Sequence, residues 1–339
     1  MSTSADSGGA RRSQRDWYWF LGRAGQILIA TGVLLFLFVG YQLWGTGIEE
    51  TQAQNRLQDR FEETIATAPT VDPTADDELP IPIESGDPIA ILRIPRIGVE
   101  KYVVEGVEPD DLKKGPGHYP HSVQPGRLGN FAVAGHRTTY GEPFRNLDEL
   151  ENGDEITVLD AKGREFVYLV TGITIVGPSD TWVVTTTDPD TAVLTLTTCH
   201  PEFSAKQRLV VSASLDTTRT PPATDDAFVA AGGLTELAIT PKTSDPSVIG
   251  TSPPVITDDS MIVREVETFD AGWFSDAGAW PDLVIWLAIE IAFVTILWRF
   301  ARRRSGGAKI SMLAVGALPG LLFLYFVFQN VSRLLPPNL

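Results

Sequence analysis

Residues 195–211 read TLTTCHPEFSAKQRLVV and hold two strand-like runs, TLTTC and RLVV, on either side of a short polar stretch. β-branched residues are frequent in both runs, as is typical of β-strands. Cys199, the only cysteine of the 339-residue chain, ends the first run, and Arg208 opens the second. A hairpin-like return of the chain would bring the Arg208 guanidinium beside the Cys199 thiol. Two plainer interpretations stay open at this point: a buried cysteine that acts as a small apolar side chain, and an arginine in a surface ion pair.

Strand signals are dense throughout residues 87–215, which have the size of an ordinary domain. The runs are IAILRIPRIGV, YVVEGV, GNFAVAGH, DEITVLD, REFVYLVTGITIVG, AVLTLTTC and RLVVSASL. Turn residues such as Lys162-Gly163 separate them, and helical periodicity is confined to the short pieces PDDLKKG and FRNLDELE. Many short strands with little helix predict an all-β domain, either a closed antiparallel barrel or a sandwich.

Three apolar runs lie outside this domain, at residues 25–44, 282–298 and 311–330. The first is long enough to cross a bilayer as a helix and longer than an ordinary signal-peptide core, so we interpret it as an uncleaved anchor. For the later two runs, the alternative is a buried hairpin of a soluble protein. Glu290 gives that alternative some weight, because a carboxylate in hydrocarbon is costly unless it is protonated or paired.

Basic residues favour the membrane interpretation. Four arginines precede the first run within residues 1–24, and residues 299–310 between the later runs hold four arginines and a lysine. The positive-inside rule places both basic segments in the cytoplasm and residues 45–280 outside the cell. The sequence therefore predicts three transmembrane helices and places the strand-rich domain outside the cell.

The two segments that flank the strand-rich domain differ from it in composition. Residues 45–86 are first polar and helix-like and then rich in proline and acid, which we interpret as an extracellular stalk and linker. Residues 216–280 are rich in proline, threonine and aspartate, a composition typical of a flexible tether.

The net charge of −16 argues against binding to nucleic acid. Scattered carboxylates of the stalk are usually solvated, so we predict no metal site and no cofactor. A single cysteine outside the membrane has no partner for a disulfide within the chain, which directs attention to its reactivity.

Nucleophilic catalysis by a cysteine requires a group that handles protons and a positive group for the developing oxyanion. His136 ends the strand-like run GNFAVAGH and opens the polar loop RTTYGEPF, so a rigid sheet would fix it. His118 and His121 lie in a loop rich in glycine and proline, which favours structural or solvated roles. His200 adjoins Cys199, and adjacent side chains of a strand point to opposite faces. His136 is therefore the first candidate.

Taken together and in chain order, these segments resemble the sortase family. The run IAILRIPRIGV is similar to the first strand of that family, GPGHYP to its loop before the histidine strand, and GNFAVAGHRTTYGEPFRNLDELENGDEI to the histidine strand and the segment after it. TLTTC with Arg208 opening RLVV completes the order, and the resemblance covers essentially all of residues 88–215. The HRTTYG segment and the paired threonines of TLTTC are most similar to class E, with class D-like features. Membrane helices at both ends are compatible with class E enzymes of high-GC Gram-positive bacteria.

The resemblance implies an eight-stranded β-barrel with short helices, flanked by the three transmembrane helices. It implies a cysteine transpeptidase that cleaves an LPxTG or LAxTG sorting signal of a secreted protein between threonine and glycine. A thioester then passes the protein to an amine of a peptidoglycan precursor or another acceptor.

The resemblance also assigns the site residues. Cys199 is the nucleophile, His136 the acid/base group and Arg208 the ligand of the oxyanion or substrate backbone. Thr197, Thr198 and Tyr140 are expected to contact the substrate.

Two alternatives belong to other functional classes. An inactive sortase-like binding module is opposed by the intact set of Cys199, His136 and Arg208, and the sequence context typical of an L,D-transpeptidase is absent. Within the sortases, a pilin-polymerising enzyme is the alternative to an anchoring enzyme. The Asp-Pro-aromatic lid motif is absent before the first strand, since Ile89 follows Asp87-Pro88, and this weakens the pilin interpretation.

Overall fold

The computed structural model describes residues 8–67, 81–223, 228–230, 276 and 278–335. The chain divides into two compact units, residues 1–45 and 46–339. The first unit contains helix α1 (Gly8–Gly40) and one turn of π-helix, η1 (Tyr41–Gly45).

Within the described residues, three helical segments are long and apolar enough to cross a membrane. They are Trp19–Ala66, Ala279–Ala301 and Gly307–Ser332. The apolar runs predicted from the sequence, 25–44, 282–298 and 311–330, fall inside them. The exact domain boundaries stay predictions.

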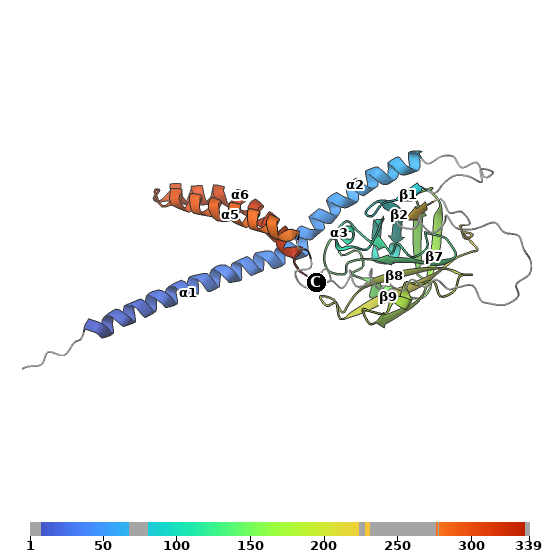
Figure 1. Cartoon of the computed structure of the whole chain (residues 1–339), viewed down its shortest axis with the longest axis horizontal. Helices are drawn as coiled ribbons and strands as arrows, with labels where there is room; N and C mark the ends of the chain where they lie inside the picture. Colours follow the sequence, from blue (N-terminus) through green and yellow to red (C-terminus); the bar gives the residue numbers. More distant parts are fainter. Residues whose placement is uncertain (1–7, 68–80, 224–227, 231–275, 277, 336–339) are drawn as a thin grey trace, which may run out of the picture. The chain divides into compact units, whose positions relative to one another are not determined.

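Eight strands of the second unit close into a barrel (Figure 1), in the order β2-β3-β4-β5-β8-β9-β7-β6. The strands are β2 (Pro88–Ile94), β3 (Val99–Glu105), β4 (Gly117–His118), β5 (Gly129–Ala134), β6 (Glu155–Asp160), β7 (Glu165–Val176), β8 (Ala192–His200) and β9 (Gln207–Leu215). The pairing of β2 with β6 closes the barrel, so that none of its strands is left with a free edge. The eight-stranded barrel that the family resemblance implies is confirmed.

The barrel is not wholly antiparallel as expected, because β3 pairs with β4 and β5 pairs with β8 in parallel. Strand β8 joins the sheet beside β5 only after the chain has formed β6 and β7, and it then runs in the same direction as β5. This long connection brings the residues after β5 level with the residues at the end of β8.

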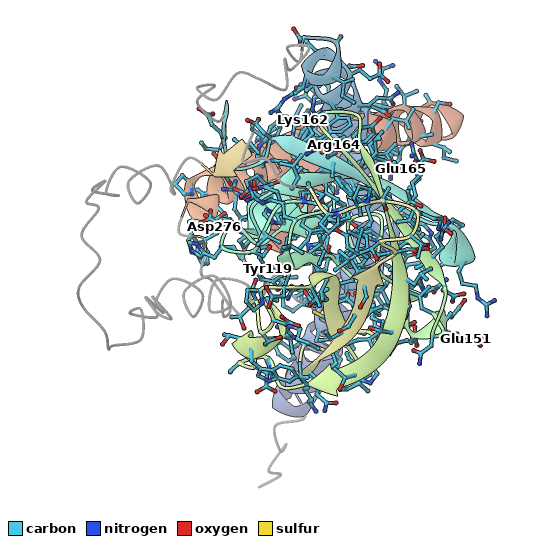
Figure 2. The ribbon with its side chains drawn as sticks, turned by 90° about the vertical axis from the view of Figure 1, so that its right-hand side faces the viewer. Tyr119, Glu151, Lys162, Arg164, Glu165 and Asp276 are labelled. Carbon is cyan, nitrogen blue, oxygen red and sulfur yellow. The ribbon has the colours of Figure 1, made fainter. Side chains whose placement is uncertain are left out.

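Short helices and turns connect the strands where the sequence predicts them. The two helical pieces appear as α3 (Pro109–Leu112) and η3 (Leu147–Glu149), and two further 3-10 turns are η2 (Pro95–Ile97) and η4 (Thr181–Val183). At the β6–β7 turn, Gly163 has a φ of 75°, a conformation that glycine adopts without strain. Lys162, Arg164 and Glu165 lie together at this turn (Figure 2).

Strands β5 and β8 lie in the most buried part of the sheet. Every residue of β5 is buried, and only Val193 and His200 of β8 are less than fully buried. A strand covered on both faces does not alternate between apolar and polar residues, and β5 (GNFAVA) is apolar except for Asn130. These two rigid strands carry the candidate active site.

Helix α2 (Thr46–Thr67) packs against the barrel beside β2 and β3 (Figure 1). Ala53, Leu57 and Phe61 are spaced four residues apart and form a buried apolar face. Phe61 contacts the ring of Tyr102 edge-on, with 5.6 Å between ring centroids. Residues 46–67, within the predicted stalk, are therefore packed on the barrel, whereas residues 68–80 lie outside the described residues.

Polar contacts add to this packing. The Gln54 side chain accepts a hydrogen bond from the Tyr102 N–H (2.8 Å) and donates to the carbonyls of Tyr102 (3.1 Å) and Lys114 (2.8 Å). Lys101 forms an ion pair with the buried carboxylate of Glu50. Both contacts join α2 to β3, so the polar face of this helix is fixed to the barrel as well as its apolar face.

The remaining described elements are a small parallel sheet and a helical hairpin. Strands β1 (Ile81–Ile83) and β10 (Phe228–Ala230) pair with each other. Helices α5 (Ala279–Ala301) and α6 (Gly307–Ser332) pack through aromatic rings, including a stacked pair of Trp286 and Phe326 at 4.3 Å. Most of the predicted tether, residues 216–280, lies outside the described residues.

Candidate active site

Cys199 and Arg208 are direct partners in the antiparallel ladder between β8 and β9. Side chains of such a pair project from the same face of the sheet, with Cβ atoms about 4.5–5.5 Å apart. The loop of residues 201–206 returns the chain at this point. The proximity expected from the sequence is therefore a consequence of strand register.

His136 reaches the same level from the neighbouring strand. Ala134, the last residue of β5, pairs with Thr197, and the N–H of Gly135 donates to the Thr197 carbonyl at 3.0 Å. Because the pairing is parallel, two further residues along each strand bring His136 level with Cys199. The structure thus brings Cys199, His136 and Arg208 together at one end of β5, β8 and β9.

All three side chains are buried, with exposed fractions of 6% for Cys199, 4% for His136 and 5% for Arg208. Burial lowers the pKa of His136 to about 4, and the charge of Lys113 acts in the same direction. The imidazole is therefore neutral near pH 7, the form that can accept a proton.

The Arg208 guanidinium is held by the loop that joins β8 and β9. Its Nη1 donates to the carbonyls of Ala205 (2.9 Å) and Gln207 (3.1 Å). Bonds to two backbone carbonyls fix the direction of the planar guanidinium.

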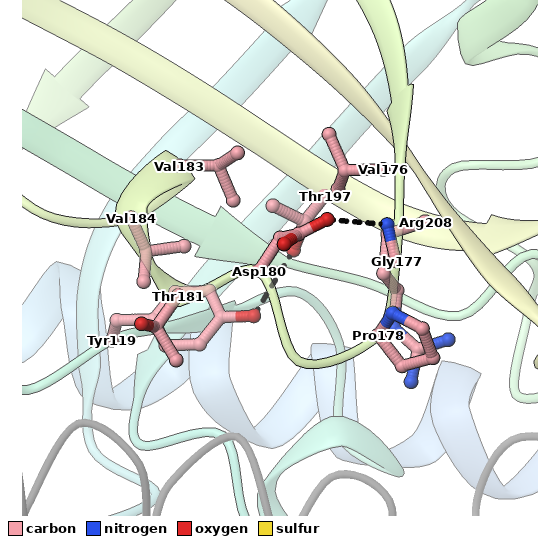
Figure 3. Close-up of a pocket in the computed structure, with 10 residues that line it drawn as sticks. All are labelled: Tyr119, Val176, Gly177, Pro178, Asp180, Thr181, Val183, Val184, Thr197 and Arg208. Carbon is pink, nitrogen blue, oxygen red and sulfur yellow. Dashed lines mark hydrogen bonds between the residues drawn. The ribbon is translucent and has the colours of Figure 1, made fainter.

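Arg208 and Thr197 line a pocket beneath the connection between β7 and β8 (Figure 3). Tyr119 closes one side, and its hydroxyl shares a hydrogen bond with Thr197 Oγ1 at 3.2 Å. The N–H of Gly177 donates to Asp180 Oδ2 at 2.7 Å and shapes the covering loop. The cavity volume of about 20 Å³ holds about one water molecule.

The three residues expected to contact substrate lie in different surroundings. Thr197 lines the pocket with Arg208, whereas Thr198 is completely buried and its hydroxyl donates to the Gly135 carbonyl at 2.7 Å. Tyr140 lies over His136, with 5.1 Å between ring centroids. Its N–H donates to Thr46 Oγ1 at 3.2 Å, and burial raises the pKa of its hydroxyl, which bonds with Ser332.

The other three histidines, His118, His121 and His200, have surroundings different from those of His136. His118 is fully buried and its Nδ1 lies 2.8 Å from Glu105 Oε2, which supports the structural role predicted for it. His121 is exposed, and His200 bonds with Arg137. Among the described residues, no group of three or more histidine, cysteine or acidic side chains is arranged to hold a metal ion.

Arg137 is a member of the site that was not predicted from the sequence. It follows His136 directly, and its guanidinium bonds with the Cys199 carbonyl. The sequence gives no signal for this contact, since the two residues are 62 positions apart and only the parallel pairing of β5 and β8 brings them together.

Sequence relatives show the family of the chain. The family profile described as "Sortase domain" matches residues 92–216. Sortase D of Bacillus subtilis is 34% identical over 176 residues, which cover 51% of this chain and 86% of that protein. The chain belongs to the sortase family.

Sortase SrtE1 of Streptomyces coelicolor is 36% identical to this sortase over 201 residues. The match covers 55% of this chain and 54% of SrtE1, so the chain spans about half the length of that relative. Among solved structures, sortase E of Streptomyces avermitilis is 40% identical, covering 41% of this chain and 96% of that one, with a TM-score of 0.35. Sortase D5 of Clostridium perfringens is 33% identical, covering 49% and 97%, with a TM-score of 0.40. The relatives thus include classes E and D, as the sequence motifs indicate.

Proposed function

We propose that this sortase is a membrane-anchored cysteine transpeptidase that acts on secreted proteins with a C-terminal LAxTG or LPxTG signal. The observation that carries the proposal is the convergence of Cys199, His136 and Arg208 at one end of β5, β8 and β9. It joins a nucleophile, a base and a fixed cation on rigid strands, and acyl transfer requires these three groups.

In the first half-reaction, Cys199 attacks the carbonyl carbon of the signal's threonine. His136, neutral because burial lowers its pKa, takes the thiol proton as the Sγ–C bond forms. Arg208 stabilises the negative charge that develops on the carbonyl oxygen. His136 then gives the proton to the glycine nitrogen, the C–N bond breaks, and a thioester remains on Cys199.

The second half-reaction reverses these roles. An acceptor amine attacks the thioester carbon and loses a proton to His136 as the new C–N bond forms. Departure of Cys199 breaks the C–S bond, and the proton returns to the thiolate. The sorted protein is then joined to a peptidoglycan precursor or another amine.

The signal enters beside Thr197, in the pocket shared with Arg208 and Tyr119. Because the cavity holds about one water molecule, the loop over it, residues 177–184, moves to admit a peptide. Tyr140 contacts the signal from the His136 side, and Thr198 acts through its bond to the Gly135 carbonyl.

The same proposal places the catalytic barrel outside the cell. The three candidate spans and the basic clusters support cytoplasmic positions for residues 1–24 and 299–310. The source is then a Gram-positive bacterium of high GC content, as the class E resemblance implies.

The test uses full-length protein in detergent with LAxTG and LPxTG peptides and a panel of amines, followed by mass analysis. We expect Thr–Gly cleavage and a new amide with at least one amine, and no product with Cys199→Ala. Cleavage at another bond, or equal turnover by the alanine variant, would reject the proposal.

A further inference from the structure

Arg137 lies between the two chain segments that carry the proposed nucleophile and base. Its side chain is 3% exposed, its backbone belongs to the loop that follows β5, and its guanidinium contacts β8. Nη1 donates to the Cys199 carbonyl at 3.3 Å and to His200 Nδ1 at 3.0 Å, and Nη2 lies 2.9 Å from Asp148 Oδ2.

A need for stability alone does not account for this guanidinium. Its Nε is buried and makes no hydrogen bond within the part of the chain that the structure describes. Its carboxylate partner, Asp148, is 51% exposed. A buried charge with an incomplete set of partners costs free energy, and an apolar residue of similar volume often replaces such a group without loss of stability.

The bonds made by Arg137 complete the link between the two segments. The Gly135 N–H and the Thr198 hydroxyl already join β8 to the end of β5. Arg137 adds the connection one residue beyond His136, where it holds the backbone of Cys199 itself. This bond therefore adds to the contacts that hold the Cys199 backbone against the His136 loop.

Arg137 also holds the ring of His200. A guanidinium has only donors, so Arg137 Nη1 donates this hydrogen bond and His200 Nδ1 accepts it. The other titratable or charged groups near the site are His136, Arg208, Lys113, Asp180 and the hydroxyls of Tyr119 and Tyr140.

We propose that Arg137 is a positioning residue for this sortase: it fixes the Cys199 backbone against the His136 loop and places a permanent positive charge beside the thiol. It is not a catalytic residue, because it contacts the Cys199 carbonyl and not the reacting sulfur. The expected effect of Arg137 on turnover rests on the proposed function, whereas its expected effect on the thiol is independent of that function.

The experiment compares Arg137→Gln and Arg137→Lys with wild type, all as full-length protein in detergent. Arg145→Gln is the matched control, since Arg145 lies in the same loop but its side chain is 42% exposed and forms surface ion pairs with Glu142 and, at 3.9 Å, with Glu202. The readouts are kcat and KM with peptide and amine, the thermal midpoint, and the rate of iodoacetamide alkylation against pH. Alkylation reports on one site because Cys199 is the only cysteine.

We expect Arg137→Gln to lower kcat about 100-fold with little change in KM, because misplacement of a reacting group by about 1 Å costs about that much. Its alkylation profile should move to higher pH, since loss of a nearby cation disfavours the thiolate. Arg137→Lys should recover more of the wild-type alkylation profile than of the wild-type kcat. The ammonium keeps the positive charge, but it lacks the planar set of donors of the guanidinium. The control should match wild type.

A wild-type kcat and alkylation profile in Arg137→Gln would overturn the inference. A lower kcat together with a lower thermal midpoint and an unchanged alkylation profile would also overturn it, because that pattern indicates a purely structural effect. If the glutamine variant does not fold, the lysine variant decides: a wild-type kcat rejects the inference, and a lower kcat with a wild-type thermal midpoint supports it. If wild type shows no transfer, the proposed function fails, while the alkylation profiles still test Arg137.

Discussion

Burial of His136 makes the stability of the barrel depend on pH, and replacing this residue by glutamine should remove that dependence. Burial lowers the folded-state pKa of His136 to about 4, from an ordinary value of 6.5. Between these values the unfolded chain binds a proton that the folded protein excludes, so stability falls as pH falls. At about 1.4 kcal/mol for each pH unit between the two values, the full effect is about 3 kcal/mol. The loss of unfolding free energy is absent above about pH 6.5 and reaches about 2.5 kcal/mol at about pH 4.5.

Urea unfolding of the full-length protein in detergent, followed by near-UV circular dichroism at about pH 7.5 and about pH 4.5, measures this effect. We expect wild type to lose about 2.5 kcal/mol more than His136→Gln between the two pH values. His121→Gln is the control, because His121 is exposed and its replacement should leave the wild-type dependence intact. Acidic groups titrate in both proteins, so they lower the free energy of unfolding equally in wild type and in His136→Gln. An equal total loss in the two proteins would therefore mean that burial of His136 contributes nothing.

Three further predictions concern other parts of the molecule. Arg208→Ala should lower kcat about 100- to 1,000-fold with a smaller change in peptide KM, because it stabilises charge that exists mainly in the transition state; an unchanged kcat would support the surface ion-pair interpretation. Phe61→Ala should lower the free energy of unfolding by about 3–5 kcal/mol in urea denaturation, whereas Ile48→Ala on an exposed position of the same helix should change it little; equal effects would mean that α2 does not pack on the barrel. A tag within residues 299–310 should be protected from labelling of intact cells and one within 216–280 should be labelled, and the reverse pattern would contradict the proposed topology.

The sequence was sufficient to predict the parts of the site that depend on local strand order. Cys199 and Arg208 flank one short loop, so a hairpin return alone makes them neighbours. His136 follows a strand whose apolar run is plain in the sequence, although its register with β8 is set by a parallel pairing between segments far apart in the chain. No local pattern encodes such a pairing.

Contacts between polar side chains and distant backbone could not be predicted in this way. Glu50 and Gln54 belong to a polar stretch that resembles a solvated stalk, yet both are buried against the barrel. Arg137 belongs to the HRTTYG motif, but its role depends on the backbone carbonyl of Cys199, which has no signature in the sequence. Apolar periodicity predicts which faces are buried, and it does not identify polar groups that are buried because distant parts of the chain satisfy them.

In the proposed reaction Cys199 carries the acyl group, and the intact mass of the full-length protein shows whether it does. After incubation with an LAxTG or LPxTG peptide in the absence of added amine, wild type should gain the mass of the peptide up to and including threonine. Hydroxylamine should remove the added mass, since it cleaves thioesters, and Cys199→Ala should gain none. An adduct of the same mass on Cys199→Ala, or Thr–Gly cleavage by that variant at the wild-type rate, would contradict the account.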